Sequence, residues 1–288
     1  MASSNCESST FFKAESGVQL LARIGGRPSL QELEPELFSG LGSSSVVELC
    51  GAPNVGKTLL LTQLTAHCLL PGKWKNQNIG GLNCGVIYID CDYHFNILKL
   101  VDLLEEIVDK SSSDIPASET ENLIKRSLQK LLVYKCNDSK HLILTLHAIH
   151  ELLANQTETS LVIVDSISAF YWLDKTYSAY SFKGVEKYYS NISKALRHLV
   201  ETFKVTLIVS RQTLFKSQKT KNSKVEEDLY NDEEYAYLGQ DWKNLVTHRV
   251  TLHFKEGYFT AEVQYSGITS NIPYTINSGG ISWKCQLS

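Results

Sequence analysis

Short apolar runs alternate along this chain with longer stretches in which apolar residues recur every three or four positions. The runs have the length and β-branched composition of buried strands, and they cover residues 46–50, 86–90, 131–134, 161–165 and 205–209. Helical spacing covers residues 59–70, 94–110, 121–130, 141–155 and 185–203. Strands that alternate with helices in this way predict an α/β fold with a mostly parallel central sheet flanked by helices.

The pattern changes after residue 210. A polar stretch there carries several lysines and then a run of acidic residues, which is typical of a long mobile loop. Strand-like segments follow at residues 246–254, 258–264, 272–276 and 281–284. We therefore expect a β-rich antiparallel edge at the C-terminal end of the sheet.

The opening of the chain predicts no domain of its own. Residues 1–39 contain a polar start and one interrupted amphipathic stretch, which is too little to build a core. We expect them to form an interaction tether without a separate DNA-binding domain, and residues 40–288 to form one core domain.

Composition narrows the class of protein. The 288 residues are 43% hydrophobic and 20% charged, with a net charge of −3, so bulk positive charge does not hold this chain on nucleic acid. Seven scattered cysteines without a C-x-x-C pair indicate a reducing compartment. No apolar run approaches the roughly 20 residues that a membrane-spanning helix needs, so we expect a soluble intracellular protein.

One motif carries specific chemistry. It reads G-x-x-x-x-G-K-[ST] and comprises Gly51, Ala52, Pro53, Asn54, Val55, Gly56, Lys57 and Thr58. The motif lies between a predicted strand and a predicted helix, where a phosphate-binding loop belongs, which argues against a chance match in a glycine-rich turn. The glycines let backbone N–H groups face a phosphate, Lys57 reaches the β- and γ-phosphates, and Thr58 offers a hydroxyl to Mg²⁺. The sequence therefore predicts a nucleoside triphosphate site.

A carboxylate at the end of a second strand completes this prediction. Asp165 follows four apolar residues, and an aspartate at the carboxyl end of a parallel strand faces the phosphates and Mg²⁺ in such folds. An ordinary helix N-cap is the alternative, since a stretch capable of forming a helix follows. The phosphate-binding loop favours the metal role.

Two further positions are candidates for the chemistry at the γ-phosphate. Asp90 and Asp92 end another predicted strand, where a carboxylate such as Asp92 could orient the attacking water, although a solvated turn would look the same. Gln212 follows the strand at 205–209 and could sense the γ-phosphate through its amide, or be a plain loop residue.

The order of these motifs resembles the ATPase core of the RecA-type recombinases over roughly residues 40–285. The shared strings are the phosphate-binding loop and residues 88–92, 164–171 and 210–212. Residues 14–17, 20–23, 89–95 and 168–172 more closely resemble a family of eukaryotic recombinase paralogues. The resemblance implies ATP as the nucleotide, Mg²⁺ at Thr58 and Asp165, and a nuclear role in homologous recombination, double-strand break repair and replication-fork maintenance. It also implies a heteromeric complex with other recombinase paralogues.

The same resemblance implies two loops that face single-stranded or branched DNA, over residues 171–184 and 215–239. Tyr177 and Tyr180 are candidates for stacking on bases in the first loop, although core packing explains some aromatic residues there better. Four lysines of the second loop are candidates for phosphate contacts, or form a solvated loop: Lys216, Lys219, Lys221 and Lys224.

Three departures from the family pattern lead us to expect at most weak DNA-dependent ATPase activity. Asp92 stands where strand-exchange members have Glu, and Arg211 stands where Asn usually precedes the sensor Gln. We also expect residues 1–39 to lack the N-terminal helical DNA-binding domain of the family. The leading hypothesis is an ATP-binding recombination mediator. A scaffold or filament-end subunit with a vestigial ATP site is the alternative, and a small P-loop kinase is disfavoured by the β-rich tail.

Overall fold

The computed structural model describes residues 16–17, 20, 26–38, 40–111, 115–177, 182–213 and 238–284. Within these ranges, nine strands form one sheet in the order β11-β10-β9-β8-β1-β7-β6-β4-β5. The strands are β1 Val46–Gly51, β4 Gly85–Asp90, β5 Leu131–Lys135, β6 Thr159–Asp165, β7 Thr206–Gln212, β8 His248–Lys255, β9 Tyr258–Tyr265, β10 Ile268–Asn277 and β11 Gly280–Trp283. The six strands from β8 to β5 pair in parallel, and β8 to β11 pair antiparallel. The predicted α/β fold with an antiparallel C-terminal edge is confirmed.

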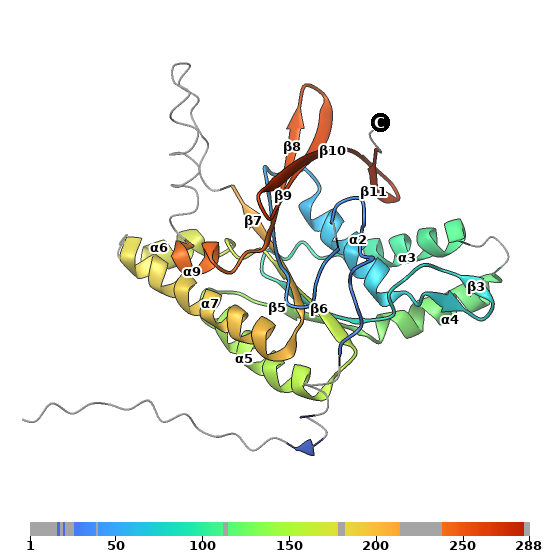
Figure 1. Cartoon of the computed structure of the whole chain (residues 1–288), viewed down its shortest axis with the longest axis horizontal. Coiled ribbons are helices and arrows are strands. Elements are labelled where there is room, and N and C mark those ends of the chain that lie inside the picture. The colour runs from blue at the N-terminus through green and yellow to red at the C-terminus, as the bar shows by residue number, and fades with distance from the viewer. Residues whose placement is uncertain are drawn as a thin grey trace, which may run out of the picture.

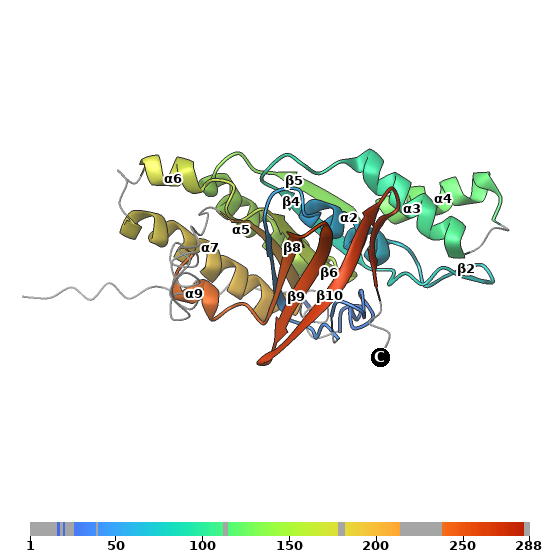
Figure 2. The same cartoon turned by 90° about the horizontal axis from the view of Figure 1, so that it is seen from above.

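Helices cover both faces of the parallel part of the sheet (Figure 1). One group consists of α2 Lys57–Leu69, α3 Ile97–Ser111 and α4 Ala117–Leu128. The other consists of α5 Ser139–Asn155, α6 Tyr171–Tyr177, α7 Phe182–Phe203 and α9 Gly239–Lys243. A ribbon of two short strands, β2 Lys73–Trp74 and β3 Gln77–Asn78, follows α2. In the view from above, the C-terminal strands β8, β9 and β10 run alongside one another (Figure 2).

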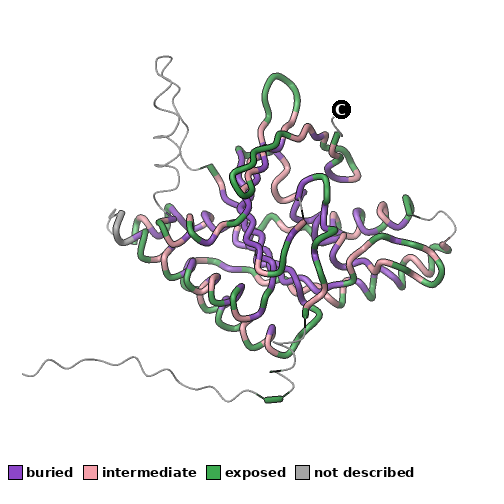
Figure 3. Tube along the Cα trace, viewed as in Figure 1, coloured by how far each residue is buried: buried purple, intermediate pink, exposed green. Residues whose placement is uncertain are grey.

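Alternation along the buried strands produces two separate cores. Val47 and Leu49 of β1 join the core under α2 and α3, whereas Val46 joins the core under α5 and α7. Successive side chains of a strand point to opposite faces, so a strand with helices on both sides must be apolar throughout. Figure 3 accordingly shows the central strands as the buried part of the molecule. Among the described residues, none of the helices is both long enough and apolar enough to span a bilayer.

Part of the N-terminal segment packs on the sheet domain. Leu30, Leu33, Leu37 and Phe38 are buried in the same core as α2 and α3. Arg27 donates hydrogen bonds to the carbonyl groups of Leu153, Gln156, Thr159 and Phe203, at 2.6, 2.7, 2.6 and 2.7 Å. Residues 27–38 thus contact the core directly, and the domain boundary at residue 39 stays a prediction.

The stretch that follows β6 differs from the sequence interpretation. The expectation of a loop over residues 171–184 is wrong for residues 171–177, which form α6, and α7 begins at Phe182. The physical reason is burial: Tyr171 and Asp174 are buried, and Asp174 accepts a hydrogen bond from Ser139 at 2.5 Å. The sequence of this segment lacks a strong helical pattern, and tertiary contacts stabilise its helical conformation. The loop predicted at residues 215–239 lies almost entirely outside the described residues.

Candidate functional site

Four neighbouring strands bring the predicted chemistry to one edge of the sheet. In the strand order β1-β7-β6-β4, Gly51 pairs with Gln212, and Asp165 pairs with Asp90. All four strands run parallel, so their carboxyl ends lie at the same edge, where α/β folds bind ligands. The structure therefore brings the phosphate-binding loop, Asp165, Asp92 and Gln212 together.

The backbone of the phosphate-binding loop takes conformations that depend on glycine. Gly51 has φ +147°, and a Cβ there would lie 2.6 Å from the carbonyl oxygen of Leu252. Gly56 has φ +95° and immediately precedes α2, so the N-terminus of that helix opens onto the loop. Backbone N–H groups and the helix dipole at such a terminus favour an anion. The loop fits a bound phosphate group.

Lys57 lies folded over this loop. Its ammonium donates hydrogen bonds to the carbonyl oxygens of Gly51 and Ala52, both at 2.8 Å. Burial lowers the pKa of Lys57, and the nearby Asp165 carboxylate opposes that shift. A poorly solvated ammonium ion held by neutral carbonyl groups gains strongly from an anionic partner. Lys57 is thus placed to bind a phosphate group.

Asp165 is the centre of a hydroxyl cluster. Its carboxylate accepts hydrogen bonds from Thr58 at 2.8 Å, from Tyr88 at 2.9 Å and from Ser210. Burial raises the pKa of Asp165 and the three hydroxyl donors lower it. The contact between Thr58 and Asp165 puts a hydroxyl and a carboxylate oxygen side by side, which suits Mg²⁺. The alternative of an N-cap role for Asp165 has no support in these contacts.

The two aspartates after β4 have different surroundings. Asp90 is fully buried and accepts hydrogen bonds from the backbone N–H groups of His94 and Phe95 at 3.2 and 3.3 Å, so it holds the turn. Asp92 instead accepts hydrogen bonds from Ser166 and from the side-chain amide of Gln212, both at 2.8 Å. Asp92 and Gln212, the two catalytic candidates, thus contact each other directly.

Arg211 faces the other side of the sheet from this cluster. Its guanidinium forms an ion pair with the fully buried Glu48 at 3.1 Å and donates a hydrogen bond to the sulfur of Cys50 at 3.3 Å. Glu48 also accepts hydrogen bonds from Arg249 and Trp242, both at 2.8 Å. Neighbouring strand residues point to opposite faces, so Arg211 and Gln212 serve different environments.

The sequence interpretation missed Tyr88, Ser166 and Ser210. Tyr88 lies inside an apolar run and reads as an ordinary strand residue. Ser166 directly follows β6 and Ser210 lies near the end of β7, within shared strings that assign neither serine a role. Tyr88 has the same strand parity as Asp90, which is a weak signal that it faces the α2 side. Its contact with Asp165 depends on the register between β4 and β6, which no local pattern encodes.

Of the candidates for DNA contact, the structure describes Tyr177 alone. Its side chain is 73% exposed at the end of α6. In the same helix, Lys175 lies over the ring of Trp172 at 5.1 Å from the centroid. Tyr180, Lys216, Lys219, Lys221 and Lys224 lie outside the described residues.

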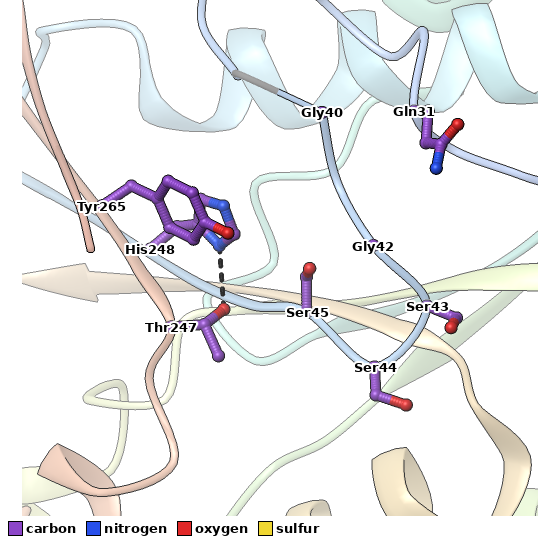
Figure 4. Close-up of a pocket in the computed structure, with 9 residues that line it drawn as sticks. All are labelled: Gln31, Gly40, Gly42, Ser43, Ser44, Ser45, Thr247, His248 and Tyr265. Atoms are coloured by element: carbon purple, nitrogen blue, oxygen red, sulfur yellow. Dashed lines mark hydrogen bonds between the residues drawn. The ribbon is translucent and has the colours of Figure 1, made fainter.

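A separate hollow lies at the opposite end of β1. Its volume is about 490 Å³, and its lining includes Ser45, Thr247, His248 and Tyr265 (Figure 4). The ring of Tyr265 stacks flat on His248 at a centroid distance of 4.1 Å, and His248 contacts the hydroxyl of Thr247 at 2.8 Å. Ser45 precedes β1, whereas the phosphate-binding loop follows it, so this hollow is distinct from the candidate site.

Comparisons with known proteins identify the family of this chain. The family model described as Rad51 matches residues 25–228. The chain is 37% identical over 249 residues to the mouse protein named DNA repair protein XRCC2, covering 84% of this chain and 85% of the relative. It is 22% identical to the Arabidopsis thaliana DNA repair protein XRCC2 homolog, over 85% and 78% of the two chains. It is 23% identical to the human DNA repair protein RAD51 homolog 2, over 88% and 67%.

These matches confirm the resemblance to recombinase paralogues, including the closer likeness to the X-ray repair cross-complementing protein two. The matched residues 25–228 contain the phosphate-binding loop, Asp92, Asp165 and Gln212. The chain belongs to the Rad51 family.

Proposed function

We propose that this chain is a recombinase-paralogue subunit that binds Mg·ATP and DNA within a heteromeric complex. In this role it promotes homologous recombination, double-strand break repair and replication-fork maintenance in the nucleus. The observation that carries the nucleotide part is the contact of Thr58 with Asp165 beside the glycine-dependent phosphate loop. The names of the relatives, which are DNA repair proteins, support the repair role.

Different residues of the site would bind the phosphates and the Mg²⁺ ion. N–H groups of the loop and the N-terminus of α2 would hold the phosphates, and Lys57 would exchange its carbonyl partners for phosphate oxygens. Thr58 and Asp165 would hold Mg²⁺, which supplies positive charge to the phosphates. Tyr88 and Ser210 orient the Asp165 carboxylate for that purpose.

Asp92 and Gln212 set the capacity for hydrolysis. Asp92 is the carboxylate that would orient the attacking water. Hydrogen bonds from Ser166 and Gln212 hold it in position. Its side chain is one methylene shorter than the glutamate that the family pattern has here, and a misplacement of about 1 Å costs on the order of a hundredfold in rate. Nucleotide binding would therefore act chiefly by ordering loops and a paralogue interface, with at most weak DNA-dependent turnover.

A scaffold or filament-end subunit with a vestigial ATP site is the second candidate. The contact between Gln212 and Asp92 favours it, because a sensor amide committed to a carboxylate is withdrawn from a γ-phosphate. Under this hypothesis the Rad51-family fold serves as a docking surface for another paralogue.

The deciding experiment measures Mg·ATP binding by the purified chain in complex with its paralogue partner. We expect saturable binding that weakens at least tenfold in Lys57→Ala, because hydrogen bonds to a charged group contribute about 1.5–3 kcal/mol. Lys125→Ala is the matched control, since Lys125 pairs with Glu121 on the surface of α4. Phosphate release with and without single-stranded DNA then measures turnover.

The outcomes separate the two candidates. Binding that depends on Lys57, with or without slow turnover, supports the ATP-dependent role. An assembled complex in which neither wild type nor Lys57→Ala binds ATP would leave only the scaffold.

A further inference from the structure

We infer that the C-terminal hairpin of β10 and β11 is a working part of the nucleotide site, with Tyr274 as the residue that positions the phosphate-binding loop. This inference rests on the proposed function, because it deepens the role of the same site. Nothing in the loop motif itself points to residues more than 200 positions later in the chain.

The key contact joins Tyr274 to the loop. The Tyr274 hydroxyl donates a hydrogen bond to the carbonyl oxygen of Val55 at 2.8 Å, and its side chain is 2% exposed. Burial raises the pKa of this hydroxyl, so it stays protonated and remains a donor. A carbonyl held by a buried donor has little freedom to turn.

This contact determines where the next N–H group points. Val55 carbonyl and Gly56 N–H belong to the same peptide unit, which is planar and trans, so the two groups point in opposite directions. Tyr274 holds the carbonyl on the side of the loop that faces β10. The Gly56 N–H is thereby turned the other way, toward the space where the loop would hold a phosphate.

Apolar contacts from the same hairpin restrict Gly56 further. A Cβ placed on Gly56 would lie 3.1 Å from Cδ1 of Ile276 and 3.4 Å from Cδ1 of Ile281. These two side chains therefore pack directly against the glycine backbone. With φ +95°, Gly56 has a conformation that few other residues adopt, and the hairpin closes the space beside it.

The hairpin is itself anchored to the rest of the site. Gln63 of α2 accepts a hydrogen bond from the Ile281 N–H at 2.7 Å and donates to the Ile281 carbonyl at 3.1 Å. Glu34 accepts a hydrogen bond from Gln63 at 2.8 Å and another from the indole of Trp283 at 2.8 Å. The N-terminal segment, α2 and the hairpin thus form one buried hydrogen-bonded unit behind the loop.

The test compares Tyr274→Phe with wild type in the full-length chain bound to its paralogue partner. The substitution removes one hydroxyl and keeps the ring. We expect the affinities for Mg·ATP and Mg·ADP to fall by a similar factor, on the order of fivefold to tenfold, because the loop contacts phosphates common to both. Tyr258→Phe is the matched control, since Tyr258 is 54% exposed and begins the adjacent strand β9.

A second readout does not need a nucleotide. In spectra of protein labelled with ¹⁵N-glycine, we expect the Gly56 amide signal to shift in Tyr274→Phe and to stay in place in Tyr258→Phe. Ile276→Ala is a second variant, expected to fold because Ile276 is 36% exposed. It should weaken binding of both nucleotides by about threefold by loosening the packing at Gly56.

These measurements distinguish failure of this inference from failure of the proposed function. If wild type binds no nucleotide, the proposed function fails, and the Gly56 signal alone decides the positioning role. If wild type binds ATP and Tyr274→Phe binds it equally well with an unmoved Gly56 signal, the inference is overturned. A loss of affinity matched by a large fall in the melting temperature of the nucleotide-free protein identifies a purely structural role and also overturns it.

Discussion

The side-chain amide of Gln212 donates a hydrogen bond to the carboxylate of Asp92 at 2.8 Å, across the ends of two strands that are not neighbours. β6 lies between them, and Ser166, the residue after β6, donates to the same Asp92 oxygen at 2.8 Å. The two residues therefore form one unit, and a change in either alters the environment of the other.

The length of the Asp92 side chain is the first testable feature. Asp92→Glu carries the carboxylate about one methylene further toward the γ-phosphate, and we expect its ATP hydrolysis to rise at least tenfold over wild type. ATP affinity should change little, because Asp92 makes no contact with Lys57 or Thr58 among the hydrogen bonds of the described residues. Phosphate release under saturating Mg·ATP measures the effect. Asp92→Asn is the control, and its rate of ATP hydrolysis should be as low as that of Lys57→Ala. Equal rates of hydrolysis for Asp92→Glu and wild type would show that the length of this side chain does not limit turnover.

The pH dependence of Mg²⁺-assisted binding reports on Asp165. Burial raises the pKa of Asp165 above its ordinary 3.8, so the folded protein binds this proton at a higher pH than the unfolded chain does. Ionisation of Asp165 therefore lowers the stability of the nucleotide-free fold as pH rises from 3.8 through the raised pKa. Under the proposed role, the ionised carboxylate is the form that would hold Mg²⁺. We expect the Mg²⁺-dependent part of ATP affinity to disappear as pH falls through that raised value.

Tyr88→Phe tests the cause of this dependence. It removes one of the donors that lower the pKa of Asp165, so the pH midpoint of Mg²⁺-dependent ATP binding should move upward. The midpoint is measured by titration calorimetry with Mg²⁺ and with EDTA. A midpoint that stays unchanged would show that Tyr88 does not act through Asp165.

Arg27 is expected to act on stability and not on the site. Its four hydrogen bonds to carbonyl groups include those of Leu153 near the end of α5 and Phe203 at the end of α7. Arg27→Ala should lower the free energy of unfolding by about 2–4 kcal/mol, because several buried carbonyl acceptors lose a charged donor. Urea unfolding measures the change. Arg126→Ala, which removes a guanidinium over the Trp74 ring at 5.5 Å, should cost only about 0.5 kcal/mol.

The buried ion pair of Glu48 and Arg211 gives a second stability prediction. Glu48→Gln keeps the shape and removes the charge, which leaves Arg211, 2% exposed, without its counter-ion. We expect a loss of about 3–5 kcal/mol in the free energy of unfolding. Glu262→Gln is the control, since its partner His253 lies 3.8 Å away and both are about one-third exposed. If the two variants unfold alike, the pair contributes no net stability.

The ion pair with Glu48 changes the interpretation of Arg211. From the sequence, an arginine beside the sensor glutamine reads as a change in catalysis. In the structure it balances Glu48 on the opposite face of β7. Strand parity alone places Arg211 and Gln212 on opposite faces, but the charge that Arg211 meets there comes from β1, 163 residues earlier.

Much of the fold and the site is determined by local pattern. Apolar runs and helical spacing predict the alternation of strands and helices, and the glycines, Lys57 and Thr58 predict a phosphate site at the carboxyl end of β1. These features are readable because they depend on neighbours in sequence: strand parity, helical period, and backbone angles that only glycine adopts easily.

The tertiary structure alone decides the contacts between distant strands. The register of β4, β6 and β7 places Tyr88 and Ser210 within hydrogen-bond distance of Asp165. It also makes Asp92, and not Asp90, the carboxylate that accepts the hydrogen bond from Gln212. The C-terminal hairpin reaches Val55 through Tyr274, 219 residues away. Register and long-range packing depend on the whole set of buried surfaces at once, so no segment of the sequence carries them by itself.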